Sequence, residues 1–577
     1  MVTILARTRE SPARTVRASL SGRRVASAAL GLALGLGLGM LALGPALRRG
    51  FLLSYDMVFV PREPFSAALP GLAPPRAVPS DLVIAAASRA LPADIGQKVV
   101  LLSIFVLACW GTAALLDREP LLARLAAGTF YAWNPYVAER LIIGQWALLL
   151  GYSGLPWVLR AVLAPDLASR RGAARLGLAL LPAVIGGFAA MAIAALIVVP
   201  AALVSRCPRR AAVALGALAV GSLPWFIPSL LRAVYVDPAS VGAFAARADT
   251  PFGSIGSLLM LGGAWNAQTV PKGYGGAWSA LWLAVVIVAL AGYLLIARPH
   301  PLAWRSKGGQ HRWPGLGVAA VAGLVIAGLG VTAAGRDLLR SAIGAWPGFA
   351  VLRDAQQFVA PLALAEAVGF GLAVAAAMNP RTFRAKQPER ARPTGPDGAG
   401  MALGVLAILA PVLLLPGLAW GAAGRLRPAW YPAQWLAAAR VVDASPASGS
   451  VLLLPWDTYR TWSWNHGETV LDPWTRLLSR PLIWNDGTRV GDLELAPDDP
   501  RARALDRAIR GSGPLTAALR AAGVRFVLDD AHAPDPQVAA RLPGSIVITD
   551  QPGLTVYQLP AALFRNRPCV TGRHQRA

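Results

Sequence analysis

Long runs of apolar residues, separated by short polar segments, dominate residues 26–422 of the chain. The first run extends from Ala26 to Leu47, which matches the roughly 20 apolar residues that a helix needs to cross a bilayer. We expect further spans near residues 96–116, 119–134, 142–164, 211–232, 277–297, 314–333, 358–378 and 401–422. The pattern predicts a mostly α-helical, polytopic membrane domain, because helices satisfy their own backbone polar groups in lipid.

One uncharged run, between Arg175 and Arg206, has two interpretations. It is too long for one upright helix and short for two. As a tight hairpin it would turn at Gly186-Gly187, since glycine accepts any turn geometry. As one tilted span it would reverse the direction of every later span.

Basic residues give the spans a direction, because cytoplasmic loops are enriched in Lys and Arg. The basic N-terminal segment, residues 1–25, and the Arg-rich loops 298–312 and 381–392 fall on the same side only if the uncharged run is a hairpin. The sequence therefore predicts a multi-pass protein of the cell membrane with about eleven spans and a cytoplasmic N-terminus. The external loops would be residues 48–95, 233–276 and 334–357.

Residues 423–577 follow a different pattern. Short runs typical of strands, such as SVLLLPWDTY, GVRFVLDD, SIVITD and LTVYQLP, alternate with helical segments such as DDPRARALDRAIRG. About 150 residues is an ordinary domain size. We expect an α/β domain, which the predicted span number places outside the cytoplasm.

Composition agrees with a membrane protein, because 55% of the 577 residues are hydrophobic and only 15% are charged. The net charge of +25 is spread over many loops, whereas a nucleic-acid surface would need one clustered patch, so we expect no nucleic-acid partner. The 3 cysteines and 5 histidines are scattered and predict neither a disulfide framework nor a histidine-rich metal site.

Polar residues at the predicted external margin of the membrane are the candidates for chemistry, because ionisable groups are costly there. Asp56 lies shortly after the first span, with a second acid at Glu63. In the stretch 131–160, Asn134 and Pro135 predict a helix start. That helix would carry Tyr136, Glu139 and Arg140 on neighbouring positions, and the polar Gln145 follows it.

Three further segments have competing interpretations. Arg353, Asp354, Gln356 and Gln357 precede a predicted span, where they would line a cavity or simply begin a helix. Gly262–Asn266 would be a re-entrant segment or an aromatic anchor in the interface. Trp456 and Asp457 open a Trp-rich stretch whose rings suit sugar faces, but would equally pack the domain against the membrane helices.

The segments YDMVFVPREPF, YAWNPYVAERLIIGQWALLLGY, FGSIGSLLMLGGAWNAQTVP and LRDAQQF, together with the layout of the chain, resemble the GT-C superfamily. These integral-membrane glycosyltransferases use polyprenyl-phosphate sugars and bear a catalytic acid in a long first external loop. The sequence also resembles uncharacterised actinobacterial proteins of this kind. Many members carry two adjacent acids in that loop, whereas Asp56 has no adjacent acid, and a divalent cation is left open as a cofactor.

The resemblance implies transfer of a sugar from a polyprenyl-phosphate donor to a cell-envelope glycan or lipid acceptor on the external face. Asp56 would be the base, because an attacking hydroxyl must lose its proton. Arg140 and Arg353 would face the lipid phosphate. The other expected substrate contacts are Glu139, Gln145, Asp354, Gln356, Trp456 and Asp457.

Two alternatives compete with transferase activity. A transporter or flippase for lipid-linked sugars would explain polar residues at membrane depth and helices interrupted by Gly and Pro. A non-catalytic envelope-assembly protein would use the C-terminal domain to bind a glycan. Inverted repeats would favour the first alternative, and glycan binding without turnover would favour the second.

Overall fold

The computed structural model describes residues 12–68, 78–205, 207–230, 236–238, 240–297, 313, 315–379, 397–491, 493–531 and 536–561. The basic loops 298–312 and 381–392, on which the predicted orientation rests, lie outside the described residues. The chain forms two compact units. The first contains residues 1–430, 459–476 and 489–495, and the second contains residues 431–458, 477–488 and 496–577.

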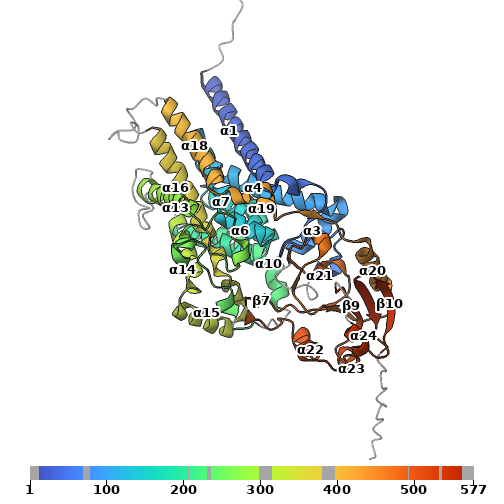
Figure 1. Cartoon of the computed structure of the whole chain (residues 1–577). Coiled ribbons are helices and arrows are strands. Elements are labelled where there is room, and N and C mark those ends of the chain that lie inside the picture. The colour runs from blue at the N-terminus through green and yellow to red at the C-terminus, as the bar shows by residue number, and fades with distance from the viewer. Residues whose placement is uncertain are drawn as a thin grey trace, which may run out of the picture. The chain divides into compact units, whose positions relative to one another are not determined.

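Helices make up most of the first unit (Figure 1). They are α1 (Pro12–Leu43), α2 (Phe65–Ala68), α3 (Ser80–Ala90), α4 (Ala93–Leu115), α5 (Leu121–Ala132), α6 (Pro135–Ile142), α7 (Trp146–Val162), α8 (Arg170–Gly186), α9 (Phe188–Val204), α10 (Pro208–Leu230), α11 (Ser240–Ala243), α12 (Gly253–Leu259), α13 (Trp278–Ala291), α14 (Leu316–Leu329), α15 (Ala333–Ala345), α16 (Ala360–Met378), α18 (Gly398–Leu414), α19 (Ala419–Gly424) and α21 (Trp474–Leu477). Shorter helical turns are η1 (Gly44–Leu47), η3 (Ala267–Thr269), η4 (Gly292–Ala297), η5 (Pro347–Leu352), η6 (Ala355–Val359), η7 (Pro416–Leu418) and η8 (Ser463–Asn465).

The described residues include 5 helical segments that are long and apolar enough to cross a membrane. They are Ala26–Leu47, Ala93–Leu115, Pro208–Leu230, Trp278–Ala297 and Ala355–Met378. The number rises to 7 if the bent pairs α14–α15 (94°) and α18 with η7–α19 (64°) each count as one span. The protein is therefore a multi-pass membrane protein. About eleven spans stay a prediction, because α5, α7, α8 and α9 have only 12 to 17 residues.

The uncharged run between Arg175 and Arg206 forms two helices. α8 ends at Gly186 and α9 begins at Phe188, and the residue between them, Gly187, has a φ of 77°. α8 and α9 pack against each other and against α7. The chain thus breaks where the hairpin interpretation placed its turn, and the hairpin across the membrane stays a prediction.

The second unit is built on a five-stranded sheet with the order β10-β11-β9-β3-β6. The central β3 pairs in parallel with β9 and β6, whereas β11 pairs antiparallel with β9 and β10. The elements are β3 (Ser450–Leu454), β6 (Leu482–Ile483), β9 (Val524–Asp529), β10 (Ile546–Gln551), β11 (Leu554–Gln558), α20 (Ala433–Ala444), α22 (Pro500–Arg510), α23 (Thr516–Ala521) and α24 (Pro536–Arg541). Strands and helices occur here as the sequence predicts, and the location outside the cytoplasm stays a prediction.

Three small antiparallel pairs belong to the first unit. They are β1 (Phe51–Leu52) with β2 (Pro428–Ala429), β4 (Tyr459–Arg460) with β5 (Val470–Leu471), and β7 (Arg489–Val490) with β8 (Leu493–Glu494). We predicted residues 459–476 as part of the C-terminal domain. The structure folds them with the membrane helices, because their partners lie in the first loop.

The first loop is fixed at its start by polar side chains from α4. The Gln97 amide donates to Leu52 O (2.7 Å) and accepts from Leu52 N (2.9 Å), as a neighbouring strand would. Lys98 Nζ donates to Gly50 O (2.7 Å), and Asp94 accepts from Gly50 N (3.1 Å). The backbone that leads to Asp56 is therefore attached to a membrane helix.

Candidate functional site

The helix α6 begins where the sequence predicts it. Asn134 Oδ1 accepts a hydrogen bond from Val137 N (3.0 Å), and Pro135 occupies the first helical turn. The Asn134 amide also donates to Phe130 O (3.0 Å) and to the Tyr152 hydroxyl (3.0 Å). This cap joins α5, α6 and α7, so it fixes the direction in which α6 presents its side chains.

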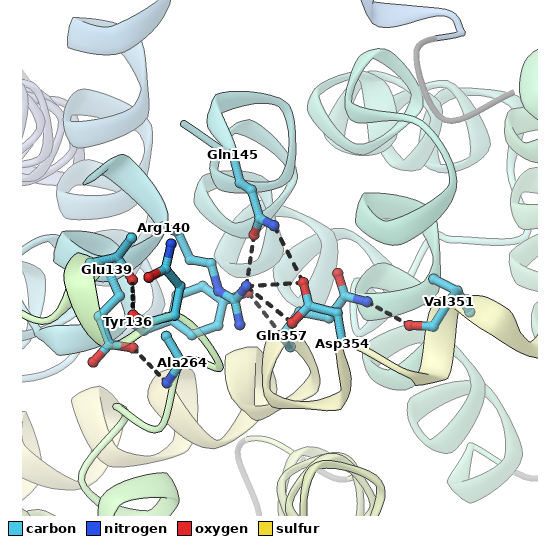
Figure 2. Close-up of polar contacts among 10 residues, drawn as sticks. Tyr136, Glu139, Arg140, Gln145, Ala264, Val351, Asp354 and Gln357 are labelled. Carbon is cyan, nitrogen blue, oxygen red and sulfur yellow. Dashed lines mark hydrogen bonds and ion pairs between the residues drawn. The ribbon is translucent and has the colours of Figure 1, made fainter. Parts of the chain in front are cut away.

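Arg140 lies at the centre of a polar cluster with Gln145 and Asp354 (Figure 2). Its Nη1 donates to Gln145 Oε1 (2.7 Å) and to Asp354 Oδ2 (3.2 Å). Gln145 Nε2 donates to the same carboxylate oxygen (3.3 Å), which closes the triangle. Asp354 is separated from Arg140 by 214 residues, so the predicted proximity of these two segments is realised in the fold.

Tyr136 supports this cluster from the preceding turn of α6. The Arg140 guanidinium lies 5.6 Å from the centre of the Tyr136 ring, which is within cation–π range. The Tyr136 hydroxyl donates to Gln357 O (2.9 Å), and Gln357 Nε2 donates to Val351 O (2.8 Å). The polar segment 353–357 is thus attached to α6 at two points.

Glu139 points away from the Arg140 cluster, toward the segment that carries Ala264 (Figure 2). Its Oε2 accepts from Ala264 N (3.2 Å). A Cβ atom on Gly262 would lie 3.1 Å from Glu139 Oε1 and 3.1 Å from Asp249 Oδ2, so both carboxyl groups face this glycine. Asp249 was not among our predicted site residues.

The Glu139 and Asp249 carboxyl groups converge on Gly262, and Glu139 Oε1 accepts no hydrogen bond within the described residues, so two buried carboxyl groups this close favour a state in which one of them carries a proton. α6 lies outside the candidate spans. Burial raises the pKa of Glu139 well above its ordinary value, and the negative charge of Asp249 raises it further. Burial also raises the pKa of Asp249, but its bond from Gly263 N opposes the shift. The proton therefore resides on Glu139.

We expect Glu139→Gln to change how stability depends on pH. The wild type should lose stability as pH rises above the ordinary value of 4.5, because the unfolded chain releases a proton that the folded chain retains. The neutral amide removes this loss. Thermal unfolding of the purified protein should be measured between about pH 5 and about pH 8. The unfolding temperature of the variant should rise relative to that of the wild type as pH rises. The exposed Asp337→Asn is the control, and parallel curves for E139Q and the wild type would contradict the proton assignment.

The loop that carries Asp56 rests on the turn between α6 and α7. Asp56 N donates to Ile143 O (3.0 Å), and the Ser54 hydroxyl donates to Ile142 O (2.7 Å). Gly144 in this turn has a φ of 84°, and a Cβ there would lie 2.3 Å from both Met57 N and Ser54 O. Gln145 is the next residue. The Asp56 loop and the Arg140 cluster thus share one support.

A second support comes from the β4–β5 hairpin. Tyr55 N donates to Thr469 O (2.7 Å), and Leu471 N donates to Tyr55 O (2.9 Å). These bonds hold Tyr55 at a φ of 43°, which is uncommon for a residue with a side chain. The Tyr459 hydroxyl donates to Asp56 Oδ1 (2.6 Å).

A partly buried arginine faces the acids of the first loop. Arg476 Nε donates to Asp81 Oδ2 (3.0 Å), and the charges of Glu63 and Asp56 also act on this guanidinium. Burial raises the pKa of Glu63 well above its ordinary value, and the charge of Asp81 adds to the shift. The positive charge of Arg476 opposes this shift and compensates part of the negative charge of these acids.

The other predicted residues lie in separate places. The Arg353 guanidinium lies 4.9 Å from the centre of the Phe244 ring. Gln356 is 1% exposed, and its amide atoms have no hydrogen-bond partner among the residues that the structure describes. In the second unit the Trp456 indole donates to Asp506 Oδ1 (2.8 Å) and its ring packs in the core, whereas Asp457 is exposed.

Sequence reasoning missed Asp249, Tyr459 and Arg476. Asp249 lies in a loop, Tyr459 in the β4–β5 hairpin and Arg476 in the short helix α21, and the role of each depends on a partner far along the chain. The acids around Asp56 do not form a ligand set for a metal, since the described part of the chain contains no group of three or more His, Cys, Asp or Glu residues suited to one. We therefore assign no step to a metal ion.

Comparison with known proteins finds a similar fold among solved structures. No family model and no curated protein matches the sequence. The cryo-EM structure of the arabinofuranosyltransferase AftD from mycobacteria matches 92% of this chain with a TM-score of 0.59 and 17% identity, and a mutant of AftD matches equally. The oligosaccharyltransferase of Archaeoglobus fulgidus gives a TM-score of 0.43 with 12% identity over 87% of the chain. The chain spans 40% of the AftD structure, and it has the GT-C fold that the sequence resembles.

Proposed function

We propose that this chain, which has the GT-C fold, transfers a sugar from a polyprenyl-phosphate donor to a glycan or lipid acceptor of the cell envelope on the external face. The similarity to AftD, which is a glycosyltransferase, supports sugar transfer as the reaction class. The apolar helices supply the membrane setting in which a lipid-linked donor dissolves.

The reaction needs one base and one site for a phosphate. An acceptor hydroxyl attacks the anomeric carbon, the new C–O bond forms as the bond to the phosphate oxygen breaks, and polyprenyl phosphate leaves with the electron pair. The hydroxyl proton passes to Asp56. Asp56 suits this role because its position is determined on both sides, by Ile143 O and by the Tyr459 hydroxyl.

Arg140 is the proposed partner of the phosphate. All of its hydrogen bonds within the described residues leave from Nη1, so Nε and Nη2 retain donors for an anion. Gln145 and Asp354 hold the guanidinium in one orientation, which reduces the entropy lost when a phosphate binds. Gln356 is proposed as a separate ligand contact, since a buried amide without protein partners is satisfied by a ligand or by water.

One observation carries this proposal. The base candidate and the phosphate candidate are attached to the same turn, residues 142–145, through Ile142, Ile143 and Gln145. A transfer reaction requires these two groups on opposite sides of one anomeric carbon. Arg353, over Phe244, is proposed as an outer contact for the donor. Asp457, which is exposed on the second unit, is proposed separately as a contact for the acceptor.

A structure with polyprenyl phosphate bound in a lipid nanodisc tests the proposal. We expect density for the phosphate beside Arg140, within reach of the Asp56 carboxylate. Polyprenyl alcohol is the matched control, because it retains the chain and lacks the charge that Arg140 would bind. A head group bound elsewhere, or identical positions for the phosphate and the alcohol, would remove Arg140 from the reaction.

A further inference from the structure

The strongest unassigned contact to Asp56 comes from the far end of the chain. The Tyr459 hydroxyl donates to Asp56 Oδ1 across 2.6 Å, and the two residues are 403 positions apart. From this contact we infer that Tyr459 is a positioning residue for Asp56, presented by the β4–β5 hairpin. The inference rests on the proposed function of Asp56 as the base.

The hairpin holds Tyr459 in place through a buried ion pair. Tyr459 lies opposite Leu471, and Arg460 lies opposite Val470. Arg460 Nη1 and Asp472 Oδ2 are 3.2 Å apart, with side chains 6% and 1% exposed. A buried pair of this kind is costly to break, so the two strands keep their register. Tyr459 therefore approaches Asp56 from a rigid element.

The same hairpin also fixes the backbone next to Asp56. Its strand β5 and the residue before it contribute both bonds to the peptide groups of Tyr55, from Leu471 N and Thr469 O. The Tyr55 and Tyr459 rings are in contact, with their centres 6.0 Å apart. One element thus sets both the main chain before Asp56 and the direction of its carboxylate.

A phenol hydroxyl is a suitable group for this task. It stays protonated at neutral pH, so it donates a hydrogen bond to a carboxylate. It does not compete with that carboxylate for the proton of the attacking sugar hydroxyl. A hydrogen bond to the charged form favours that form, which keeps the base ionised. The charge of Arg476 acts on Asp56, and the charges of Glu63 and Asp81 act on Arg476 in turn. These groups remain in place when the Tyr459 hydroxyl is removed.

The test is Tyr459→Phe in the full-length protein in nanodiscs, with a polyprenyl-phosphate sugar as donor. We expect kcat to fall at least about 10-fold at neutral pH, with KM for the donor changed less than about twofold. The acidic limb of the kcat–pH profile should move upward by about one pH unit, because the carboxylate loses a bond that favoured its charged form. If Tyr459 had only a structural role, its replacement would lower the amount of folded enzyme and would leave the acidic limb of the kcat–pH profile unchanged.

A second variant covers the case in which phenylalanine disturbs the hairpin. Fluorotyrosine at position 459 keeps the ring and the hydroxyl but donates more strongly, so the acidic limb should move downward. Tyr55→Phe is the matched control, since the Tyr55 hydroxyl donates to Gln268 Oε1 (2.5 Å) rather than to Asp56. The acidic limb of the kcat–pH profile should not move in this variant.

The outcomes separate this inference from the proposed function. If Asp56→Asn is inactive and Tyr459→Phe keeps the wild-type kcat and acidic limb, Tyr459 has no positioning role while the base assignment stands. If Asp56→Asn retains full activity, the proposed function fails whatever Tyr459 does. Opposite shifts for phenylalanine and fluorotyrosine support the inference.

Discussion

Asp56→Asn is expected to abolish sugar transfer while the protein still inserts into the membrane. The amide has the shape of the carboxylate and can accept the Tyr459 hydrogen bond through its oxygen, so the loop keeps its place. It cannot take a proton from the attacking hydroxyl. Removal of a general base lowers the rate by about 10²–10⁴-fold. The measurement is transfer from a labelled polyprenyl-phosphate sugar, normalised to the protein recovered in the membrane fraction.

The control for this prediction is Asp337→Asn, which removes a carboxylate on α15 that is 71% exposed and pairs only with Arg340 among the described residues. Its activity should stay within about twofold of the wild type, since exposed ion pairs contribute little. Full activity of D56N would exclude Asp56 as the base and would return the transporter and assembly interpretations to consideration.

Gly144→Ala should lower transfer by about 100-fold, although residue 144 contacts no substrate in the proposed mechanism. Alanine at a φ of 84° is strained, and its Cβ would lie 2.3 Å from Met57 N and from Ser54 O. The loop must move away from the turn, which displaces Asp56 relative to Arg140. A shift of about 1 Å in a reacting group is enough for a loss of this size. Transfer activity and the unfolding temperature should be measured on the same preparation.

Gly216→Ala provides the matched substitution, because a Cβ at this position in α10 meets nothing within 4 Å. It should be neutral or slightly stabilising in a helix. If G144A transfers sugar as fast as G216A, the shared turn does not determine the position of Asp56.

Local signals in the sequence predicted the local features of the site. Asn134 and Pro135 have the chemistry of a helix start, and α6 begins there because the cap needs only residues within one turn. Gly187 likewise marked the break between α8 and α9. The proximity of Arg140 and Asp354 could also be inferred, because both were placed at the same membrane margin by counting spans.

Contacts between distant segments could not be predicted in this way. Nothing in the neighbourhood of Tyr459 indicates a partner in the first loop, and Asp249 lies in a loop without a motif. The prediction of the number of spans failed to reach the same accuracy for a different reason. Hydropathy measures the apolar length of a segment, whereas α14 and α18 end early at sharp bends that hydropathy does not record.

The pairing of Tyr459 with Asp56 across 403 residues also has a consequence for biosynthesis. A ribosome that adds about 5–20 residues per second needs roughly 20–80 s to reach the hairpin after it has made the first loop. During this interval α1 and α4 can insert and α6 can pack, but Tyr55 lacks its strand partner and Asp56 lacks its hydroxyl donor. A nascent chain that stalls before residue 459 would therefore sit in the membrane without a finished base, and such products should be inert.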